Sequence, residues 1–567
     1  MNTSDNAQAL RSTPLARASR ARGARAAFLP RRQRPIAIVA AYALPAILLL
    51  ALWLPGCNQG WLRTDSHVYA SIGLQAWRAG DLWNLRVGEA LYFNKPPLVF
   101  WVHGLFLHVF GFSVWASRLP SLLAAIGAAV ATVHLARRIT NLRIGACAGM
   151  VLALSVEFFR YTRAISLDLW LVLFLMIGLA MIAEGWRSAR DAERVGATCD
   201  ESQRRARRWI VASGVAFGLA LLTKPFMGIS GPLVAAAWLA WEGVIARSER
   251  GVRARPLWPW ALASAGVALL VASPWHIGQA LTHPDLFWNV YLFEQSLDRA
   301  VKTQDPQPWW YYGRMLGENY HPWLLLTVLC LIAWGQGKLG RSGTSTPGTS
   351  TPGVPGDRSL LRLSLLWSVL WLVALTFFAG KSGRYAVVVY PLLAMPSAIW
   401  LVHLAPVWLR RGGITTSLRL AGVLLLVAIV LAAVGLRVHR GVDDHIRELA
   451  AAFDGEQVSE LESSTGVPTS TPLYATFAAN REAHNLYLLR GVMPRLARLP
   501  AGWNREGTAS DAGTSALEHP TAAAATVPPP GALLVTSSDQ APLFAPYAAR
   551  LWTGGGLELF RVERGWE

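Results

Sequence analysis

Acidic side chains stand at the edges of apolar segments in this chain, where ionisable groups are costly and usually serve a function. Asp65 and Tyr69 lie four residues apart in TDSHVYASIGLQAW, so a helix would place both on one face. Asp168 begins the apolar run LDLWLVLFL. These carboxylates could take a proton from an acceptor or orient it. A solvated loop helix for Asp65 and a helix cap or salt bridge for Asp168 are the structural alternatives.

Cationic side chains occupy similar positions. Lys95 follows Tyr92 in LYFNKPPLVFW, where two prolines force an extended backbone and keep the lysine out of a helix. Lys224 separates two short apolar segments, and Arg384 with Tyr385 lies in the turn GKSGRYAVVVYP. Lysine and arginine hold phosphate oxygens, so the pattern favours a site for a lipid-linked phosphate. Snorkelling in an aromatic belt is the alternative for Lys95, and interfacial anchoring is the alternative for Arg384.

Metal-binding and disulfide patterns are weak. His276, His283 and Asp285 lie in SPWHIGQALTHPDLFW at a spacing that is not typical of a metal site, and we expect His276 to contact substrate. The four cysteines show no CxxC or other ligand spacing, which predicts no disulfide framework and no thiolate zinc site.

The composition indicates a membrane protein. The chain has 567 residues, of which 53% are hydrophobic and 15% are charged, and it contains 26 tryptophans. Lys and Arg outnumber Asp and Glu by 53 to 34, but the arginines lie mostly in short loops between apolar runs. This distribution favours membrane topology and not nucleic-acid binding.

Apolar runs long enough to cross a bilayer core recur along the chain. The sequence predicts eleven spans, at 35–55, 114–136, 143–160, 165–185, 209–223, 226–243, 258–274, 321–337, 360–380, 386–405 and 419–436. The run 98–112 is shorter and contains two histidines, so we expect an interfacial helix there.

Loop charges set the predicted orientation. Residues 1–34 hold eight arginines and form a cytosolic basic tail before an uncleaved first span. Arginines also fill the alternate loops, which places those loops in the cytosol. The segments 56–113, 275–320 and 437–567 then face the periplasm or exterior, together with the charged residues described above.

The predicted domains are the cytosolic tail, a transmembrane domain at 35–436 and a small periplasmic α/β domain at 437–567. In the last domain, LLVTSS at 533–538 and LELFRVE at 557–563 are predicted strands. An Ala, Pro and Gly-rich stretch at 505–531 splits the strand-like pieces of this domain and predicts a disordered insert. The repeated TSTPG at 344–357 predicts a flexible linker.

An ordered set of motifs resembles a known family. DSHVY, LYFNKPPLVFW, GFSVWASRLPSLLAAI, LDLWLVLFL, GLALLTKPFMG, SPWH and KSGRYAVVVYP occur in the order found in bacterial aminoarabinose transferases of lipid A and the related protein mannosyltransferases. The resemblance runs from about residue 35 to 405. It implies a type C glycosyltransferase fold, with about 11 to 13 transmembrane helices and periplasmic juxtamembrane helices.

The resemblance also implies an activity: transfer of a sugar, such as 4-amino-4-deoxy-L-arabinose, from undecaprenyl phosphate to lipid A or another envelope acceptor. The active site would face the periplasm from the bacterial inner membrane. By motif position Asp65 and Asp168 are the catalytic carboxylates, and Lys95, Lys224 and Arg384 bind the donor phosphate. The resemblance further implies that four residues contact the substrates: Tyr69, Tyr92, Tyr385 and His276.

Two departures from the family pattern affect these implications. Ser66 stands where family members commonly have a second acid, and Asn94 stands where aminoarabinose transferases commonly have glutamate. A divalent metal held by that glutamate and a histidine would lose its carboxylate here, so the sequence leaves a metal cofactor open. No nucleic acid partner is expected.

Three rival interpretations stay open. A protein O-mannosyltransferase would need a groove open to a polypeptide. A transporter of lipid-linked sugars should show inverted repeats around a midplane site, whereas the charged residues here gather on the outer side. A purely structural membrane scaffold would make no use of Asp65.

Overall fold

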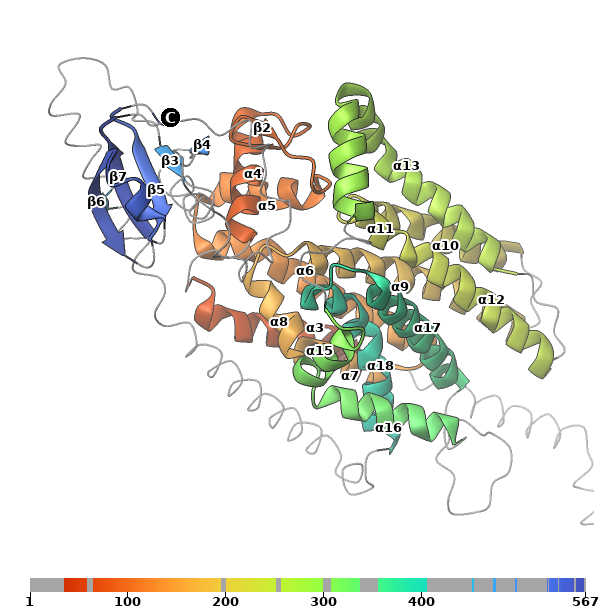
Figure 1. The fold of residues 1–567 in the computed structure, drawn as a ribbon. Coiled ribbons are helices and arrows are strands. Elements are labelled where there is room, and N and C mark those ends of the chain that lie inside the picture. The colour runs from red at the N-terminus through yellow and green to blue at the C-terminus, as the bar shows by residue number, and fades with distance from the viewer. Residues whose placement is uncertain are drawn as a thin grey trace, which may run out of the picture. The chain divides into compact units, whose positions relative to one another are not determined.

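The computed structural model describes most of the membrane region and parts of the C-terminal segment. The described residues are 35–58, 65–194, 200–250, 256–298, 307–336, 355–404, 451–452, 473–475, 495–496, 528, 530–538, 540–554 and 557–564. Met1–Ala41 and Tyr42–Glu567 form two separate units, and the first helix crosses this division. The arrangement given below is that of the second unit (Figure 1).

Long apolar helices dominate the described residues. Seven helical stretches are long and apolar enough to cross a membrane, and the number is eight if one bent pair counts as a span. They are Pro35–Gly56, Val114–Ile139, Leu167–Asp191, Pro225–Ile245, Trp258–Thr282, Asp357–Phe377 and Gly383–His403, with the pair Leu142–Ala153 and Val156–Arg163 bent by 62°. The chain is therefore a multi-pass membrane protein.

Eight of the predicted spans correspond to these stretches. The predicted span at 209–223 is helical, within α10 (Asp200–Leu221), and that at 321–337 coincides with the short helix α16 (Trp323–Gly335). Neither belongs to the seven, because α10 begins with a run of arginines and α16 has only 13 residues. The predicted span at 419–436 lies outside the described residues, so the total of eleven stays a prediction.

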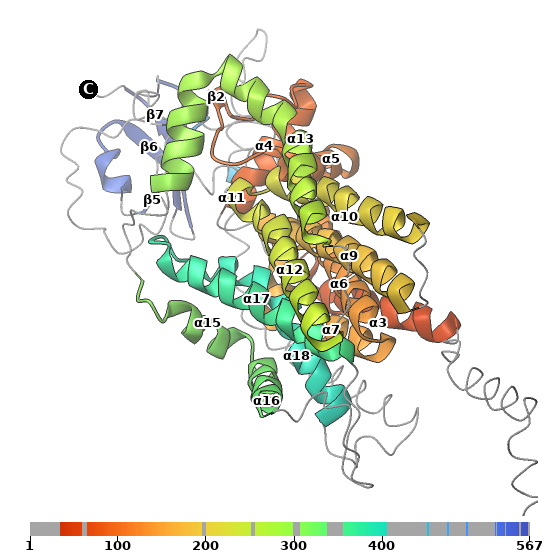
Figure 2. The same ribbon diagram turned by 90° about the vertical axis from the view of Figure 1, so that its right-hand side faces the viewer.

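Neighbouring helices pack in a consistent order. Helix α9 (Leu167–Arg194) lies between α6 (Val114–Ile139) and α10, and α13 (Trp258–Thr282) packs on the other side of α10 (Figures 1 and 2). Asn141 starts α7 (Leu142–Ala153) by accepting hydrogen bonds from the backbone N–H groups of two residues in its first turn. The α6–α7 hairpin is therefore closed by a local cap.

The remaining membrane helices complete the bundle. They are α3 (Pro35–Trp53), α8 (Val156–Arg160), α11 (Pro225–Gly228), α12 (Ser230–Arg250), α17 (Pro355–Phe377) and α18 (Tyr390–Ile399). Helix α12 packs against α13 and α17, while α18 packs against α7, α16 and α17. Many outward side chains of the bundle, such as Leu269 and Leu270 of α13 and Val373 of α17, are exposed and apolar, as expected for surfaces that meet lipid.

Two helices after the first span form a compact hairpin. Helix α4 (Ser66–Ala79) and α5 (Leu98–Phe110) are joined through the short strands β1 (Arg86–Val87) and β2 (Ala90–Leu91). Their backbones meet at Gly73 and Gly104: a Cβ on Gly73 would lie 2.6 Å from the carbonyl oxygen of Phe100, and one on Gly104 would overlap the backbone of Gly73. The predicted helix at 98–112 is thus present as α5, while its place relative to the bilayer stays a prediction.

The C-terminal part contains a five-stranded mixed sheet with strand order β4-β3-β5-β7-β6. Its strands are β3 (Leu473–Ala475), β4 (Arg495–Leu496), β5 (Leu533–Ser537), β6 (Ala548–Gly554) and β7 (Leu557–Val562). Strand β3 runs parallel to β4 and β5, whereas β7 pairs antiparallel with β5 and β6. The strands predicted at 533–538 and 557–563 are confirmed as β5 and β7. The domain boundaries stay predictions.

The glycine contact between α4 and α5 gives a first prediction. Gly104→Ala should lower the thermal unfolding midpoint of the detergent-purified protein, because the new methyl group overlaps backbone that cannot move aside alone. The matched control is Gly266→Ala in α13, where nothing lies within 4 Å of an added Cβ. Alanine is the better helix former, so this control should be neutral or slightly stabilising. Equal midpoints for both variants would contradict the proposed close packing.

Candidate active site

The first ion pair joins residues that are 319 positions apart in sequence. Asp65 immediately precedes α4, and its Oδ2 atom accepts a hydrogen bond from Arg384 Nη1 at 3.0 Å. The same oxygen accepts one from Tyr69 Oη at 3.3 Å. The Asp65 side chain is 17% exposed, so this carboxylate is largely withdrawn from water and held by two donors. The four-residue spacing of Asp65 and Tyr69 does bring them together.

The second ion pair joins the starts of two other helices. Asp168 lies in the first turn of α9, and Lys224 precedes α11 in an extended conformation. Lys224 Nζ donates to Asp168 Oδ1 at 2.6 Å, and the two side chains are 12% and 8% exposed. Pro225 cannot continue the preceding helix, so the chain is extended at Lys224. The lysine side chain contacts α9 from this break between helices. This arrangement explains why a lysine interrupts the apolar run.

Tyr385 connects the two pairs. The Lys224 ammonium lies 4.9 Å from the centroid of its ring, and the Arg384 guanidinium carbon lies 5.8 Å from the same centroid. Both cations are therefore within cation–π range of one aromatic ring. Four charged residues that are scattered through the sequence thus gather around a single tyrosine.

The turn that carries Arg384 and Tyr385 is itself anchored. It begins the 3₁₀ helix η4 (Gly383–Val389) and packs on α15 (Tyr311–Asn319). Tyr312 Oη accepts a hydrogen bond from the backbone N–H of Ser382 at 3.2 Å and donates to its carbonyl oxygen at 3.4 Å. Burial raises the pKa of Tyr312, so its hydroxyl keeps the proton that it donates. Nothing in the local sequence around Tyr312 indicated this role.

Two serines hold the segment before α9 in place. Ser66 Oγ accepts a hydrogen bond from the backbone N–H of Ile165 at 3.2 Å, and Ser121 Oγ accepts one from Ser166 at 3.0 Å. The starts of α4 and α9, which carry Asp65 and Asp168, are thereby linked. Ser66, which replaces the second acid of the family pattern, has a structural contact that the sequence did not reveal.

A fully buried histidine extends this support. His103 of α5 makes a hydrogen bond through Nδ1 with the carbonyl oxygen of Ser117 at 2.8 Å, and Trp170 Nε1 donates to its Nε2 at 3.3 Å. Ser121 Oγ lies 3.4 Å from Nε2. Burial lowers the pKa of His103 to about 4, against a small opposing effect of the hydrogen bond with Ser117. The neutral imidazole therefore ties together α5, α6 and α9 behind Asp168.

The other predicted residues lie in different surroundings. Tyr92 and Tyr69 pack edge-on against the same ring, Phe100, with centroid distances of 5.4 Å and 5.3 Å. Lys95 is half-buried in the segment between β2 and α5. His276 lies in an aromatic cluster with Trp275, Phe287 and Tyr291, apart from the contacts of the two ion pairs.

The residues that would hold a divalent metal do not fit that role. His276 Nδ1 is 2.8 Å from the carbonyl oxygen of Ala272, and Nε2 is 2.7 Å from Tyr291 Oη, so both ring nitrogens have hydrogen-bond partners. Asn94 offers a neutral amide where a carboxylate ligand would stand. Within the described ranges, no three His, Cys, Asp or Glu side chains are grouped as a metal would require.

Comparisons with known proteins show what this chain is similar to. A family model described as dolichyl-phosphate-mannose-protein mannosyltransferase matches residues 94–277. The chain is 28% identical, over 64% of its length, to the undecaprenyl phosphate-alpha-4-amino-4-deoxy-L-arabinose arabinosyl transferase of Erwinia tasmaniensis. It is 26% identical over 71% of its length to such a transferase of Pseudomonas fluorescens. This chain is similar to these transferases. The predicted resemblance is confirmed, although the chain spans only 57% and 62% of those relatives.

Solved structures of such glycosyltransferases share the fold. ArnT from Cupriavidus metallidurans bound to undecaprenyl phosphate superposes with a TM-score of 0.64 at 18% identity, covering 91% of this chain and 97% of that one. The archaeal oligosaccharyltransferase AglB from Archaeoglobus fulgidus gives a TM-score of 0.52 at 13% identity, covering 81% and 64%. The predicted type C glycosyltransferase fold is confirmed.

The Asp168–Lys224 pair gives a second prediction. Asp168→Asn should destabilise the protein by about 3 kcal/mol, because it leaves the Lys224 ammonium buried without a counter-charge. Adding Lys224→Met should recover most of that loss, since the lone charge is then removed. Thermal unfolding midpoints of the two single variants and the double variant measure the coupling. Simple addition of the two single losses would show that the pair does not act as a unit.

His103 gives a prediction on pH. The unfolded chain takes up a proton on this histidine below about pH 6.5, whereas the folded chain does so only near pH 4. The stability contributed by the neutral imidazole is therefore present above pH 6.5 and decreases by up to about 3 kcal/mol as the pH falls through this window. Thermal unfolding from pH 7 to 4.5 should show a shallower decline for His103→Gln than for the parent protein. Parallel declines would contradict a buried neutral histidine.

Proposed function

We propose that this chain is a glycosyltransferase that moves a sugar from a polyprenyl-phosphate carrier to an acceptor at the membrane surface. The observation that carries the proposal is the gathering of Asp65, Arg384, Asp168 and Lys224 around Tyr385 at the ends of apolar helices. Paired carboxylates and cations at such a place suit a substrate that joins a phosphate to a polar sugar. The names of the relatives suggest undecaprenyl phosphate as the carrier and 4-amino-4-deoxy-L-arabinose as the sugar.

The reaction requires a nucleophile and a leaving group. An oxygen of the acceptor attacks the anomeric carbon of the sugar, and the bond from that carbon to the carrier phosphate breaks. The electron pair stays on the phosphate, which leaves with an additional negative charge. Lys95, Lys224 and Arg384 would stabilise that charge through ammonium and guanidinium donors.

The carboxylates act on the acceptor side. If the acceptor is a hydroxyl group, Asp65 takes its proton as the new glycosidic bond forms, with Asp168 in a supporting role. If the acceptor is an ionised phosphate of lipid A, no base is needed, and Asp65 would orient the acceptor or bind a cationic amino sugar. Both routes balance without an oxidant, a reductant or a nucleotide.

The two ion pairs engage two of the cations that we assign to the donor phosphate. Arg384 and Lys224 each contact a carboxylate, so a donor phosphate would compete for the same donors. Binding would loosen the contacts of Asp65 and Asp168 and leave these carboxylates to meet the acceptor. We propose that the substrates contact Tyr69, Tyr92, Tyr385 and His276. The ring of Tyr385 already lies within cation–π range of Lys224 and Arg384.

The proposed location is the bacterial inner membrane, with the active site on the periplasmic side. The support is the distribution of arginine, which is concentrated in the loops at the opposite end of the spans. Lipid A, or another envelope molecule in that leaflet, is then the acceptor within reach. The small sheet formed by β3–β7 belongs to the C-terminal segment proposed to face the same compartment.

A second function, transfer of a sugar to a protein, is favoured by one finding. The family model that matches residues 94–277 is described by protein mannosylation. The two functions share the donor chemistry and differ in the acceptor, so analysis of the products separates them.

The activity prediction uses a strain that lacks the gene and is complemented by variants. Asp65→Asn should reduce the sugar-bearing form of lipid A by about 100-fold or more, because the carboxylate that orients or deprotonates the acceptor is gone. Mass spectrometry of lipid A and of envelope proteins provides the measurement. Arg384→Gln should give a loss of similar size through the donor phosphate.

Asp81→Asn is the matched control, since it makes the same chemical change in the same extramembrane segment. Asp81 accepts hydrogen bonds from Asn84 within its own turn, and this variant should keep the parent activity. Full activity of Asp65→Asn would overturn the proposed mechanism. Loss of a sugar from proteins with unchanged lipid A would instead favour the second function.

A further inference from the structure

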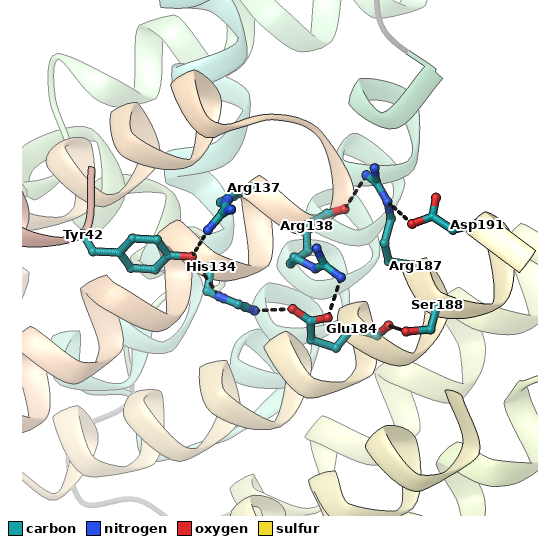
Figure 3. Close-up of polar contacts among 8 residues, drawn as sticks. All are labelled: Tyr42, His134, Arg137, Arg138, Glu184, Arg187, Ser188 and Asp191. Atoms are coloured by element: carbon teal, nitrogen blue, oxygen red, sulfur yellow. Dashed lines mark hydrogen bonds and ion pairs between the residues drawn. The ribbon is translucent and has the colours of Figure 1, made fainter. Parts of the chain in front are cut away.

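A second polar cluster joins α3, α6 and α9 (Figure 3), and its contacts are separate from those of the candidate active site. Along α9, Glu184 is 16 residues beyond Asp168, which corresponds to about 24 Å of helix. Because a bilayer core is about 30 Å thick, the cluster is close to the opposite membrane surface. Its members come from α3, α6 and α9 and are Tyr42, His134, Arg137, Arg138, Glu184, Arg187, Ser188 and Asp191.

The two carboxylates of the cluster are already engaged. Glu184 contacts Arg138 Nη2 at 2.6 Å and His134 Nε2 at 2.7 Å. Asp191 accepts from Arg187 Nε at 3.0 Å. Each of these two arginines therefore has a counter-charge within the cluster, as Figure 3 shows.

Arg137 is different. Its Nη1 donates to Tyr42 Oη at 3.2 Å, and its guanidinium lies 5.8 Å from the centroid of the same ring. Tyr42 Oη is in turn 2.8 Å from His134 Nδ1, which fixes the tyrosine. In the part of the chain that the structure describes, no carboxylate forms an ion pair with Arg137. This half-buried guanidinium is thus held in position by neutral groups.

The cluster contains more hydrogen-bond donors and more positive charge than its carboxylates pair with. Three arginines face two carboxylates, so one positive charge is left over when His134 is neutral. Nε of Arg138 is also buried and has no acceptor among the described residues. A partly buried cation without a counter-charge is unfavourable unless an anion completes the site. Planar guanidinium groups are well suited to phosphate oxygens.

The outer surface of α3 is apolar. Leu44, Ile47 and Leu50 are 46%, 59% and 42% exposed, as expected for a helix surface that meets lipid. Arg137 lies in the last turn of α6, a membrane helix, and phospholipid phosphates lie at the level of helix ends. A lipid phosphate is therefore the anion that we place beside this guanidinium, and a free phosphate is the alternative that the test separates from it.

We propose that Arg137 and Arg138 bind the phosphate of an anionic phospholipid in the leaflet opposite the candidate active site. The lipid would contact both α3 and α6 and stabilise the packing of the first span on the bundle. Basic pockets between membrane helices are known to bind such headgroups in general. The proposal is independent of the transferase activity, because it concerns the other end of the helices.

The test uses the full chain purified in a neutral detergent. Phosphatidylglycerol and phosphatidylcholine with identical acyl chains are titrated, and the thermal unfolding midpoint is followed. We expect a saturable rise with phosphatidylglycerol that phosphatidylcholine does not produce. In Arg137→Gln the apparent affinity for phosphatidylglycerol should fall about tenfold, because the variant loses one charge-assisted hydrogen bond to the phosphate. Equal responses of the parent protein to both lipids would overturn the proposal.

Arg207→Gln is the matched control. This arginine of α10 is also half-buried and lies 4.9 Å from an aromatic ring, that of Trp260, so the change in charge and environment is alike. It should retain the affinity of the parent for phosphatidylglycerol. If Arg137→Gln and Arg207→Gln weaken binding equally, general electrostatic attraction explains the effect and the specific site is wrong.

Two further measurements complete the design. Inorganic phosphate at the same ionic strength should not reproduce the midpoint shift, and a full shift with phosphate alone would show a free-anion site instead of a lipid site. If Arg137→Gln does not fold, Tyr42→Phe takes its place, because it keeps every charge but removes the hydroxyl that holds Arg137. It should weaken binding of phosphatidylglycerol, and an unchanged affinity would contradict the proposal.

Discussion

The site depends on opposite charges held together where water is scarce. Asp65 with Arg384 and Asp168 with Lys224 form two ion pairs whose members come from four separate segments, and Tyr385 lies against both cations. At the edge of an apolar bundle each of these charges is costly by itself, so the pairing is what allows them to be present. In the proposed mechanism, a donor phosphate would compete with these two carboxylates for the same cations.

The surrounding structure holds the backbone segments that carry the two ion pairs in position. The contact between Gly73 and Gly104 brings α4 against α5, and His103 of α5 reaches α6 and α9 through hydrogen bonds. Serine hydroxyl groups then bind the backbone just before Asp168, and Tyr312 fixes the turn before Arg384. Positioning here is achieved by neutral, well-paired polar groups, which do not disturb the electrostatics of the charged ones.

The comparison with relatives separates what is shared from what is particular to this chain. The fold is shared with ArnT from Cupriavidus metallidurans over nearly its whole length. Ser66 and Asn94 depart from the family pattern, and the structure gives Ser66 a backbone contact in the support of α9. His276 makes hydrogen bonds with Tyr291 and the backbone of Ala272.

The sequence by itself determined the membrane class, the positions of most helices, two C-terminal strands and the charged residues worth examining. Length and hydropathy predict the spans because a bilayer requires long apolar helices. They also indicate the charged residues, because an ionisable side chain at the membrane edge is costly and therefore rare. Tertiary structure decided which charges form pairs. Nothing in the local sequence indicates that Asp65 pairs with a residue 319 positions away. Nor does it indicate that Lys224 pairs with Asp168. The tertiary structure also showed the contacts of Tyr312, His103 and Arg137. Their types are ordinary, and only their burial and partners, which depend on helix packing, set them apart.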